Sequence, residues 1–395
     1  MGRALVLAAA LFTAAPLRAE EALTLAQLSE LVEAVNPALK AAEQQARAAD
    51  ATASQAALYP NPTLTYDYAV EKTVGLSQDF ELPGKRHSRL ETGHREADLS
   101  RAKYAQVRAD LKADVEEAYY QLLLARQRAD LLKRQAQTLS KMQAQVGQRY
   151  QPGLKNSVDT VRIDLEAAGV QKASRQAAAE EEIAIAALNT LLLRPATASL
   201  EIQGSLETSF PQLTLERLQD AAGQSPALVS AQKAMDLKSA ELSFARKAWL
   251  PDIKAGPNYS RGSGDERLIG FNVGVPLPLW NRNQRAVAAS QSSRDAAQFE
   301  ASGVQAIVAQ DLHRQLRAYQ AAQEQVRTFQ AGLLDQAAQV MVQAQSAYKQ
   351  GLINLTDFLD VLRTSLQAKD DYAQALWESH RSLAEIERRL GRPLE

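Results

Sequence analysis

The chain has 395 residues, and its 45 Lys and Arg residues nearly balance its 46 Asp and Glu residues, for a formal net charge of −1. This balance lacks the basic surplus that is typical of nucleic-acid binding, so no nucleic-acid partner is expected. The absence of Cys argues against disulfides, thiolate metal sites, cysteine nucleophiles and a lipid on an N-terminal cysteine. Hydrophobic residues make up 46% and aromatic residues only 6%, which favours helix–helix packing.

The first 19 residues are predicted to be a secretory signal peptide. Arg3 provides a positive charge, residues 4–17 form a nearly uncharged apolar run, and Ala19 precedes the expected cleavage point. The run is shorter than the roughly 20 residues that a membrane-spanning helix needs, and no other apolar run is long enough. The alternative is a buried N-terminal helix. We therefore expect an exported protein that can cross a membrane only with strands.

The remaining sequence repeats itself in two halves, residues 20–197 and 198–395. Six short matches recur in the same order, roughly 190 to 200 residues apart, which indicates an internal duplication. They are Leu23-Thr24-Leu25 with Leu213-Thr214-Leu215, Asn36-Pro37 with Ser225-Pro226, Tyr59-Pro60 with Leu250-Pro251, Leu82-Pro83 with Leu277-Pro278, Gly153-Leu154 with Gly351-Leu352, and Arg194-Pro195 with Arg392-Pro393.

Short helices and a pair of strands are predicted at the start of each half. Asn36 and Ser225 are expected to be helix N-caps, because each precedes a Pro at the first helical position. Apolar and polar residues then alternate with a period of two at about 62–82 and 252–279, which predicts strands with one apolar and one polar face.

A long helical hairpin is predicted after each strand pair, at about 88–193 and 285–391. Its long helix, about 88–149 or 285–348, would measure roughly 90 Å at ~1.5 Å per residue. Apolar residues recur along these helices at heptad spacing, which is typical of coiled coils. In the second half this stripe consists of Tyr319, Val326, Leu333, Val340 and Ala347.

These elements suggest how the chain crosses a membrane. Four strands cannot close a barrel, and an open sheet edge is not viable in lipid. Three chains would supply 12 strands, an even number suited to an outer-membrane barrel. The expected fold is mainly α with a small β part: a long coiled-coil α-barrel plus four strands per chain in a trimeric 12-stranded transmembrane β-barrel. The alternatives are a periplasmic α+β protein with two small hairpins and a periplasmic coiled-coil adaptor.

The sequence resembles the TolC family of outer-membrane efflux proteins over almost its whole length. The resemblance is carried by the duplication, by Asn36-Pro37 and Ser225-Pro226, and by the strand-to-helix junctions at 81–86 and 275–283. These junctions are most similar to the cobalt–zinc–cadmium branch of that family, which serves heavy-metal exporters.

The resemblance implies a homotrimeric duct of a tripartite efflux system. Such a duct lies in the outer membrane of a Gram-negative bacterium, contacts outer-membrane lipid and extends into the periplasm. Its implied partners are a periplasmic adaptor (membrane fusion) protein and an inner-membrane pump of the resistance–nodulation–division type. Heavy-metal cations are one class of substrate that it would export.

Two glycines mark the expected turns of the helical hairpins. Gly153 and Gly351 suit the positive φ that ends a helix, and each precedes a Leu, namely Leu154 or Leu352. The resemblance implies that these four residues form the adaptor contact.

Three aspartates follow the hairpin turns: Asp159, Asp357 and Asp360. Asp357 and Asp360 share a helix face, and the resemblance implies that they form a gate at the narrow end of the duct. Three-fold symmetry would gather six carboxylates, which raises their pKa values and favours cations. The alternative is that these acids only stabilise the first turns of their helices. In the first half, Arg162 takes the position that corresponds to Asp360.

Enzymatic function is not predicted. The sequence contains no phosphate-binding loop, zinc-protease helix or nucleophile elbow, and no cofactor or metal site is expected. The adjacent acids Glu116 and Glu117 point to different helix faces and are expected to be solvated, and His380 has no paired ligand at helical spacing.

Overall fold

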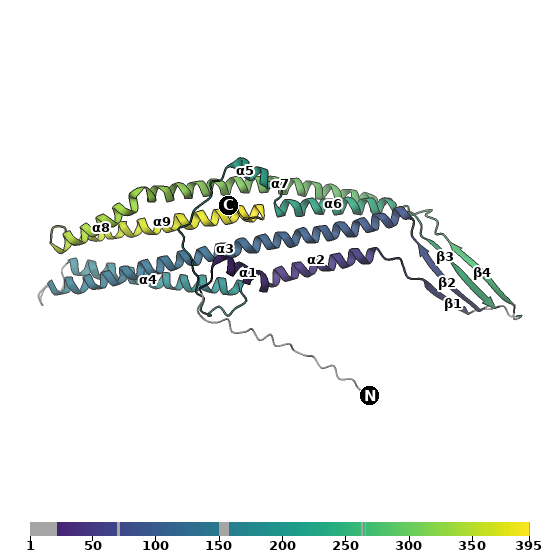
Figure 1. Ribbon diagram of the computed structural model, residues 1–395, viewed down its shortest axis with the longest axis horizontal. Helices are drawn as coiled ribbons and strands as arrows, with labels where there is room; N and C mark the ends of the chain where they lie inside the picture. The colour runs from purple at the N-terminus through teal and green to yellow at the C-terminus, as the bar shows by residue number, and fades with distance from the viewer. Residues whose placement is uncertain (1–21, 69–71, 150–157, 262–263, 265, 395) are drawn as a thin grey trace, which may run out of the picture.

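The chain forms an elongated bundle of helices with a four-stranded sheet at one end (Figure 1). The computed structural model describes residues 22–68, 72–149, 158–261, 264 and 266–394, without the side chains of 145–149. The predicted signal peptide lies outside the described residues. The helices are α1 (Leu25–Val35), α2 (Pro37–Ala56), α3 (Pro83–Arg149), α4 (Val158–Leu191), α5 (Leu215–Ala222), α6 (Pro226–Lys247), α7 (Gln284–Thr328), the π-helix η1 (Phe329–Leu333), α8 (Leu334–Lys349) and α9 (Leu355–Leu390). The strands are β1 (Thr63–Tyr68), β2 (Lys72–Phe80), β3 (Ile253–Arg261) and β4 (Arg267–Gly274).

Both halves follow the same order of two helices, two strands, a long helix and a returning helix. The 67 residues of α3 correspond to a length of ~100 Å at ~1.5 Å per residue. In Figure 1 the sheet lies at one end of the bundle, and the turn from α8 to α9 lies at the other. The sheet and this turn are therefore separated by nearly the full length of the molecule.

The two helices that open with Pro begin differently. The Asn36 side chain caps α2 by accepting hydrogen bonds from the backbone N–H groups of Ala38 (2.9 Å) and Leu39 (3.2 Å), as predicted. Ser225 stands at the corresponding position of α6, but its hydroxyl makes no capping hydrogen bond. The Pro at the first position of α6 has no backbone N–H, so one donor fewer needs a partner at the start of this helix.

The second long helix is interrupted, contrary to the prediction of one continuous helix over 285–348. The π-helix separates α7 from α8, and Gly332 within it has a φ of 117°. Only Gly adopts this backbone conformation readily, because it has no Cβ.

The heptad stripe is buried before the interruption and exposed after it. Tyr319 and Val326, before the π-helix, are each 3% exposed, whereas Leu333 and Val340 are 43% and 48% exposed. A π-turn contains an additional residue, so the helix that follows is rotated about its axis. The predicted stripe is therefore buried within this chain only in its first part.

The sheet has the antiparallel order β1-β2-β3-β4, so the strand pair of one half adjoins the pair of the other through β2 and β3. Tyr66, Val74, Tyr259 and Ile269 lie opposite one another in one row across all four strands. At Gly256 in β3, a Cβ atom would lie 1.8 Å from the backbone oxygen of Leu76, so the close approach of β2 and β3 requires a glycine there.

The largest hydrophobic core lies in the middle of the bundle, away from the sheet. Leu28 and Val32 of α1, Leu122 of α3, Leu188 of α4 and Ala375 of α9 are all fully buried there. This core joins helices from both halves, so it fixes the helical body from which the sheet extends.

Candidate functional site

The sheet exposes two chemically different faces. Side chains alternate along each strand, and residues directly opposite each other share a face. One face carries large apolar side chains that are 40% to 86% exposed: Leu64, Tyr66, Tyr68, Val74, Leu76, Phe80, Tyr259, Ile269, Phe271 and Val273. The other carries small or polar residues, including Thr65, Asp67, Thr73, Gly75, Asn258, Ser260, Gly270 and Asn272. One face therefore suits lipid, and the other suits water.

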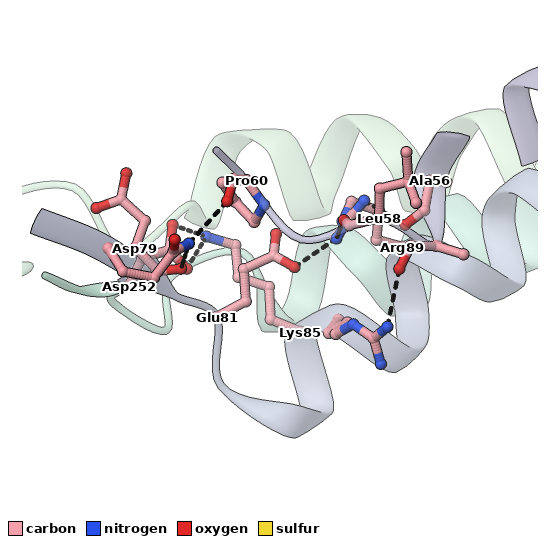
Figure 2. Close-up of polar contacts among 11 residues, drawn as sticks. Ala56, Leu58, Pro60, Asp79, Glu81, Lys85, Arg89 and Asp252 are labelled. Carbon is pink, nitrogen blue, oxygen red and sulfur yellow. Dashed lines mark hydrogen bonds and ion pairs between the residues drawn. The ribbon is translucent and has the colours of Figure 1, made fainter. Parts of the chain in front are cut away.

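The junction between sheet and helices is held by charged side chains from the first turns of α3 (Figure 2). The Lys85 ammonium group lies 2.8 and 2.7 Å from the two carboxylate oxygens of Asp252, just before β3. Arg89 donates to the Glu81 carboxylate (2.6 Å) and to the backbone oxygen of Ala56 at the end of α2. These contacts link α3 to α2 and to the second half, so the sheet is tied to the helical body.

The turn between α8 and α9 has the geometry predicted at Gly351. Gly351 has a φ of 76°, and the Asn354 side chain caps α9 by accepting a hydrogen bond from the Asp357 backbone N–H (2.8 Å). Leu352 projects from the turn with 73% of its side chain exposed. Gly153 and Leu154, the corresponding residues of the first hairpin, lie outside the described residues.

Asp357 and Asp360 are both exposed on α9, one turn apart, and Asp159 lies in the first turn of α4. The structure thus places Asp357 and Asp360 on one face of one helix. The Asp360 carboxylate lies 3.6 Å from the guanidinium group of Arg363, so part of its charge is compensated.

Two contacts join α4 and α9 close to these aspartates. Arg363 donates from Nε to the Glu166 carboxylate (3.0 Å), and its second nitrogen also contacts that group. Arg162, the residue that replaces an acid in the first half, donates to the Thr356 hydroxyl. Sequence reasoning did not identify Glu166 or Arg363, because the pairing connects residues far apart in the chain.

A half-buried pair of carboxyl groups lies farther along the bundle, and here the sequence-based prediction was wrong. Glu116 was expected to be solvated, but it packs against Glu387 of α9. Burial, followed by the charge of Glu387, raises the pKa of Glu116 to about 8. Glu116 therefore keeps its proton at neutral pH and donates it to Glu387, which also accepts a hydrogen bond from the Leu394 backbone N–H (2.7 Å). Glu117, by contrast, is accessible and pairs with Arg381 (3.0 Å).

His380 is buried one layer away from this pair. Its ring stacks on Tyr120 with 3.6 Å between the ring centroids, and its Nε2 donates to the Leu206 backbone oxygen (2.9 Å). Burial lowers the pKa of His380 to about 4, so the ring is neutral and packs as an aromatic group. In the sequence of α3, Ala113, Tyr120 and Leu124 recur at helical spacing on the same face as Glu116, a pattern that could have indicated that this face packs against another element.

Within the described residues, no helix carries an apolar stretch long enough to cross a bilayer. No group of three or more His, Asp or Glu side chains in that part of the chain is arranged to hold a metal ion.

A helical bundle of this length, continued at one end by a sheet with an apolar and a polar face, has the architecture of an outer-membrane channel subunit. The chain belongs to the outer membrane efflux protein family, whose family model matches residues 28–192 and 217–392. Its class is therefore the efflux duct, and not the coiled-coil adaptor.

Individual relatives agree with this assignment. The cobalt-zinc-cadmium resistance protein CzcC of Cupriavidus metallidurans is 27% identical over 386 residues, which cover 96% of this chain and 91% of CzcC. The nickel-cobalt-cadmium resistance protein NccC of Alcaligenes xylosoxydans xylosoxydans is 26% identical over 290 residues, which cover 68% of this chain and 65% of NccC. The open state of the outer membrane channel MtrE of Neisseria gonorrhoeae has a similar fold, with a TM-score of 0.78 at 19% identity over 94% of this chain and 89% of MtrE.

Proposed function

We propose that three copies of this chain form one duct through the outer membrane of a Gram-negative bacterium and into the periplasm. The observation that carries this proposal is the two-faced, open-edged sheet, in which β1 and β4 each pair on one side only within the part of the chain that the structure describes. Pairing β4 of one copy with β1 of the next would join three four-stranded sheets into twelve strands. Closure would cover the exposed strand edges and turn the apolar faces toward lipid.

Membrane fractionation and mass determination in detergent test this assembly. We expect the protein in the outer-membrane fraction, with three times the mass of the processed chain after detergent extraction. A stable water-soluble monomer would contradict the proposal, because it would leave the apolar face of the sheet in water.

We propose heavy-metal cations as the cargo of the duct. The names of CzcC and NccC, which concern resistance to cobalt, zinc, cadmium and nickel, support this class of substrate. Ions would pass as substrates through a water-filled duct, so the proposal needs no resident metal site. Deleting the gene in its natural host should lower tolerance of cobalt, zinc or cadmium salts, and plasmid-borne protein should restore it. Unchanged tolerance of all three metals would contradict this substrate class.

The partners in this proposal are a periplasmic adaptor and an inner-membrane pump of the resistance–nodulation–division type. The adaptor would contact the hairpin turns, at Gly351 and Leu352 and at Gly153 and Leu154. The exposed Leu352 side chain supports this contact, because the turn between α8 and α9 that carries it lies at the end of the bundle opposite the sheet (Figure 1). An apolar side chain exposed on a rigid turn is a common anchor in protein interfaces.

We propose that Asp357 and Asp360, with Asp159 nearby in the first half, narrow the same end of the duct and favour cations. The Glu166–Arg363 ion pair holds α9 against α4 at this point. Opening that moves the α8–α9 hairpin away from α4 would therefore separate Glu166 from Arg363. The Arg363 side chain is 57% exposed and the Glu166 side chain 13% exposed, so water already reaches the arginine side of this ion pair.

A further inference from the structure

An apolar row of β4 continues past the end of the sheet. The ladder between β3 and β4 ends at Gly274. Beyond it, the alternate residues Val275, Leu277 and Leu279 are 44%, 71% and 61% exposed, and Trp280 is 88% exposed. Pro276 and Pro278 separate the three, and the Leu279 backbone N–H donates to the Leu277 backbone oxygen (2.9 Å). The apolar row of β4 is therefore prolonged to Leu277, and the chain turns there toward the helices.

Uncompensated positive charge follows this apolar run. Residues 275–294 contain three Arg and no Asp or Glu. Arg282 and Arg285 are exposed, and their guanidinium groups have no ion-pair partner among the described residues. At the other junction, Lys85 and Arg89 each contact a carboxylate (Figure 2), and Arg86 lies over the Tyr59 ring. We call Leu277, Leu279, Trp280, Arg282 and Arg285 the Trp280 collar.

A hydrogen bond fixes the position of the collar. The Asn283 side chain donates from Nδ2 to the backbone oxygen of Ala245 at the end of α6 (2.7 Å). Arg246 and Trp249, which follow Ala245, are also exposed, so further basic and aromatic side chains lie at this level of the molecule.

The collar lies at the depth of a membrane surface if the sheet spans the bilayer. The eight residues of β4 extend ~27 Å along the strand, which at the ~40° tilt of barrel strands covers ~21 Å of the ~25 Å apolar band, and Val275 and Pro276 continue it. The collar begins directly after this span. Trp side chains prefer the boundary between hydrocarbon and headgroups, and Arg binds phosphate oxygens through paired N–H groups.

We propose that the Trp280 collar binds the phosphate headgroups of anionic phospholipids in the membrane leaflet nearest the helical bundle. Leu277 and Leu279 contact the upper acyl chains, Trp280 lies at the boundary, and Arg282 and Arg285 bind phosphate. The inference rests on the proposed function, because it requires the sheet to lie in a membrane.

Charge explains why lipid, and not a second copy of the chain, is the occupant. Pairing of β4 with β1 of a second copy would bring residues 57–62 of that copy close to the collar. This segment contains no acid, and it exposes Leu58 (58%) and Tyr59 (63%). The guanidinium group of Arg86 lies 4.4 Å from the centre of the Tyr59 ring and adds another cation. A second copy would thus extend the apolar and basic surface without neutralising Arg282 and Arg285.

Tryptophan fluorescence in vesicles tests this proposal, because the sequence contains only three Trp residues. A Trp249→Phe/Trp377→Phe variant keeps Trp280 as the single emitter. It is reconstituted into phosphatidylcholine vesicles that contain a minor fraction of brominated phosphatidylglycerol or, for comparison, brominated phosphatidylcholine. We expect quenching to be strongest with bromine close to the headgroup. We also expect phosphatidylglycerol to quench more strongly, since each Arg near an anionic surface favours it about five-fold.

Charge variants in the same background separate the two parts of the collar. Arg282→Gln/Arg285→Gln should abolish the preference for phosphatidylglycerol while quenching by brominated phosphatidylcholine persists. Arg294→Gln, farther along α7 and 3.2 Å from Asp295, is the matched control and should keep the preference.

Three results would overturn the inference. If the protein floats with the vesicles but its fluorescence is not quenched, another protein surface covers Trp280. In that case the Trp280→Ala variant should also lose the trimer. A preference for phosphatidylglycerol that survives Arg282→Gln/Arg285→Gln would refute the headgroup contact. Failure of the protein to float with vesicles at all would contradict the proposed function itself, and the collar with it.

Discussion

Replacing Glu116 by Gln should remove a pH-dependent loss of stability from the middle of the helical bundle. In the native protein Glu116 has a pKa of about 8, against an ordinary value of 4.5, and burial is the main cause. Between these two values the folded protein binds a proton that the unfolded chain has released. The stabilisation is thus complete below pH 4.5 and is lost as the pH rises through 8. Gln keeps an N–H donor for the Glu387 carboxylate but does not titrate.

The magnitude follows from this proton. Each pH unit inside the window costs up to ~1.4 kcal/mol of unfolding free energy, so the change from pH 6.5 to pH 8 costs up to ~2 kcal/mol. Titration of His380 does not contribute to the difference in unfolding free energy between pH 6.5 and pH 8. Its pKa is lowered to about 4, so it contributes stability that is lost on acidification between pH 6.5 and 4, below the range compared.

Thermal unfolding followed by circular dichroism in detergent measures the effect at pH 6.5 and 8. We expect the melting temperature of Glu116→Gln, relative to the natural protein, to rise by a few degrees between the two pH values. Glu117→Gln is the matched control, because Glu117 is accessible and pairs with Arg381; its difference from the natural protein should not change with pH. An infrared band of a protonated carboxylic acid at pH 7 should disappear in Glu116→Gln. An equal pH dependence of all three proteins would refute a buried, protonated Glu116.

Three further changes test other parts of the molecule. Gly256→Ala places a Cβ atom 1.8 Å from the Leu76 backbone oxygen, so β2 and β3 must separate, and we expect loss of the detergent-stable assembly. In the control variant Gly264→Ala the added Cβ meets no atom within 4 Å, and this variant should assemble normally. Leu352→Asp should weaken binding of the cognate adaptor at least tenfold in a pull-down without changing the oligomer, because burial of a charge replaces burial of an apolar side chain; unchanged binding would argue against the adaptor contact. The double variant Asp357→Ala/Asp360→Ala should raise single-channel conductance and lower cation selectivity in planar bilayers, whereas the control Asp371→Ala on the same helix should change neither. Identical currents in all variants would favour a purely structural role for Asp357 and Asp360.

Much of the architecture could be predicted from local sequence patterns. Alternation with a period of two defined strands, heptad spacing defined long helices, and Asn36 and Gly351 marked a helix start and a turn. These signals are local because capping, positive φ and strand amphipathicity each depend on a few neighbouring residues. The resemblance to the efflux family rests on the internal duplication, on Asn36-Pro37 and Ser225-Pro226, and on the strand-to-helix junctions.

Only the tertiary structure decided which polar groups are buried and which are paired. Glu116 differs from Glu117 because packing of α9 removes water from one face of α3 and leaves the other accessible. The Glu166–Arg363 pair joins residues 197 positions apart, which no local pattern encodes. The π-helix at Gly332 rotates the stripe that the heptad pattern treated as continuous. Ion pairing, desolvation and helix rotation each depend on which other part of the chain lies nearby. For this reason the sequence by itself determined the helices and strands, whereas the tertiary structure determined which side chains are paired, buried or protonated.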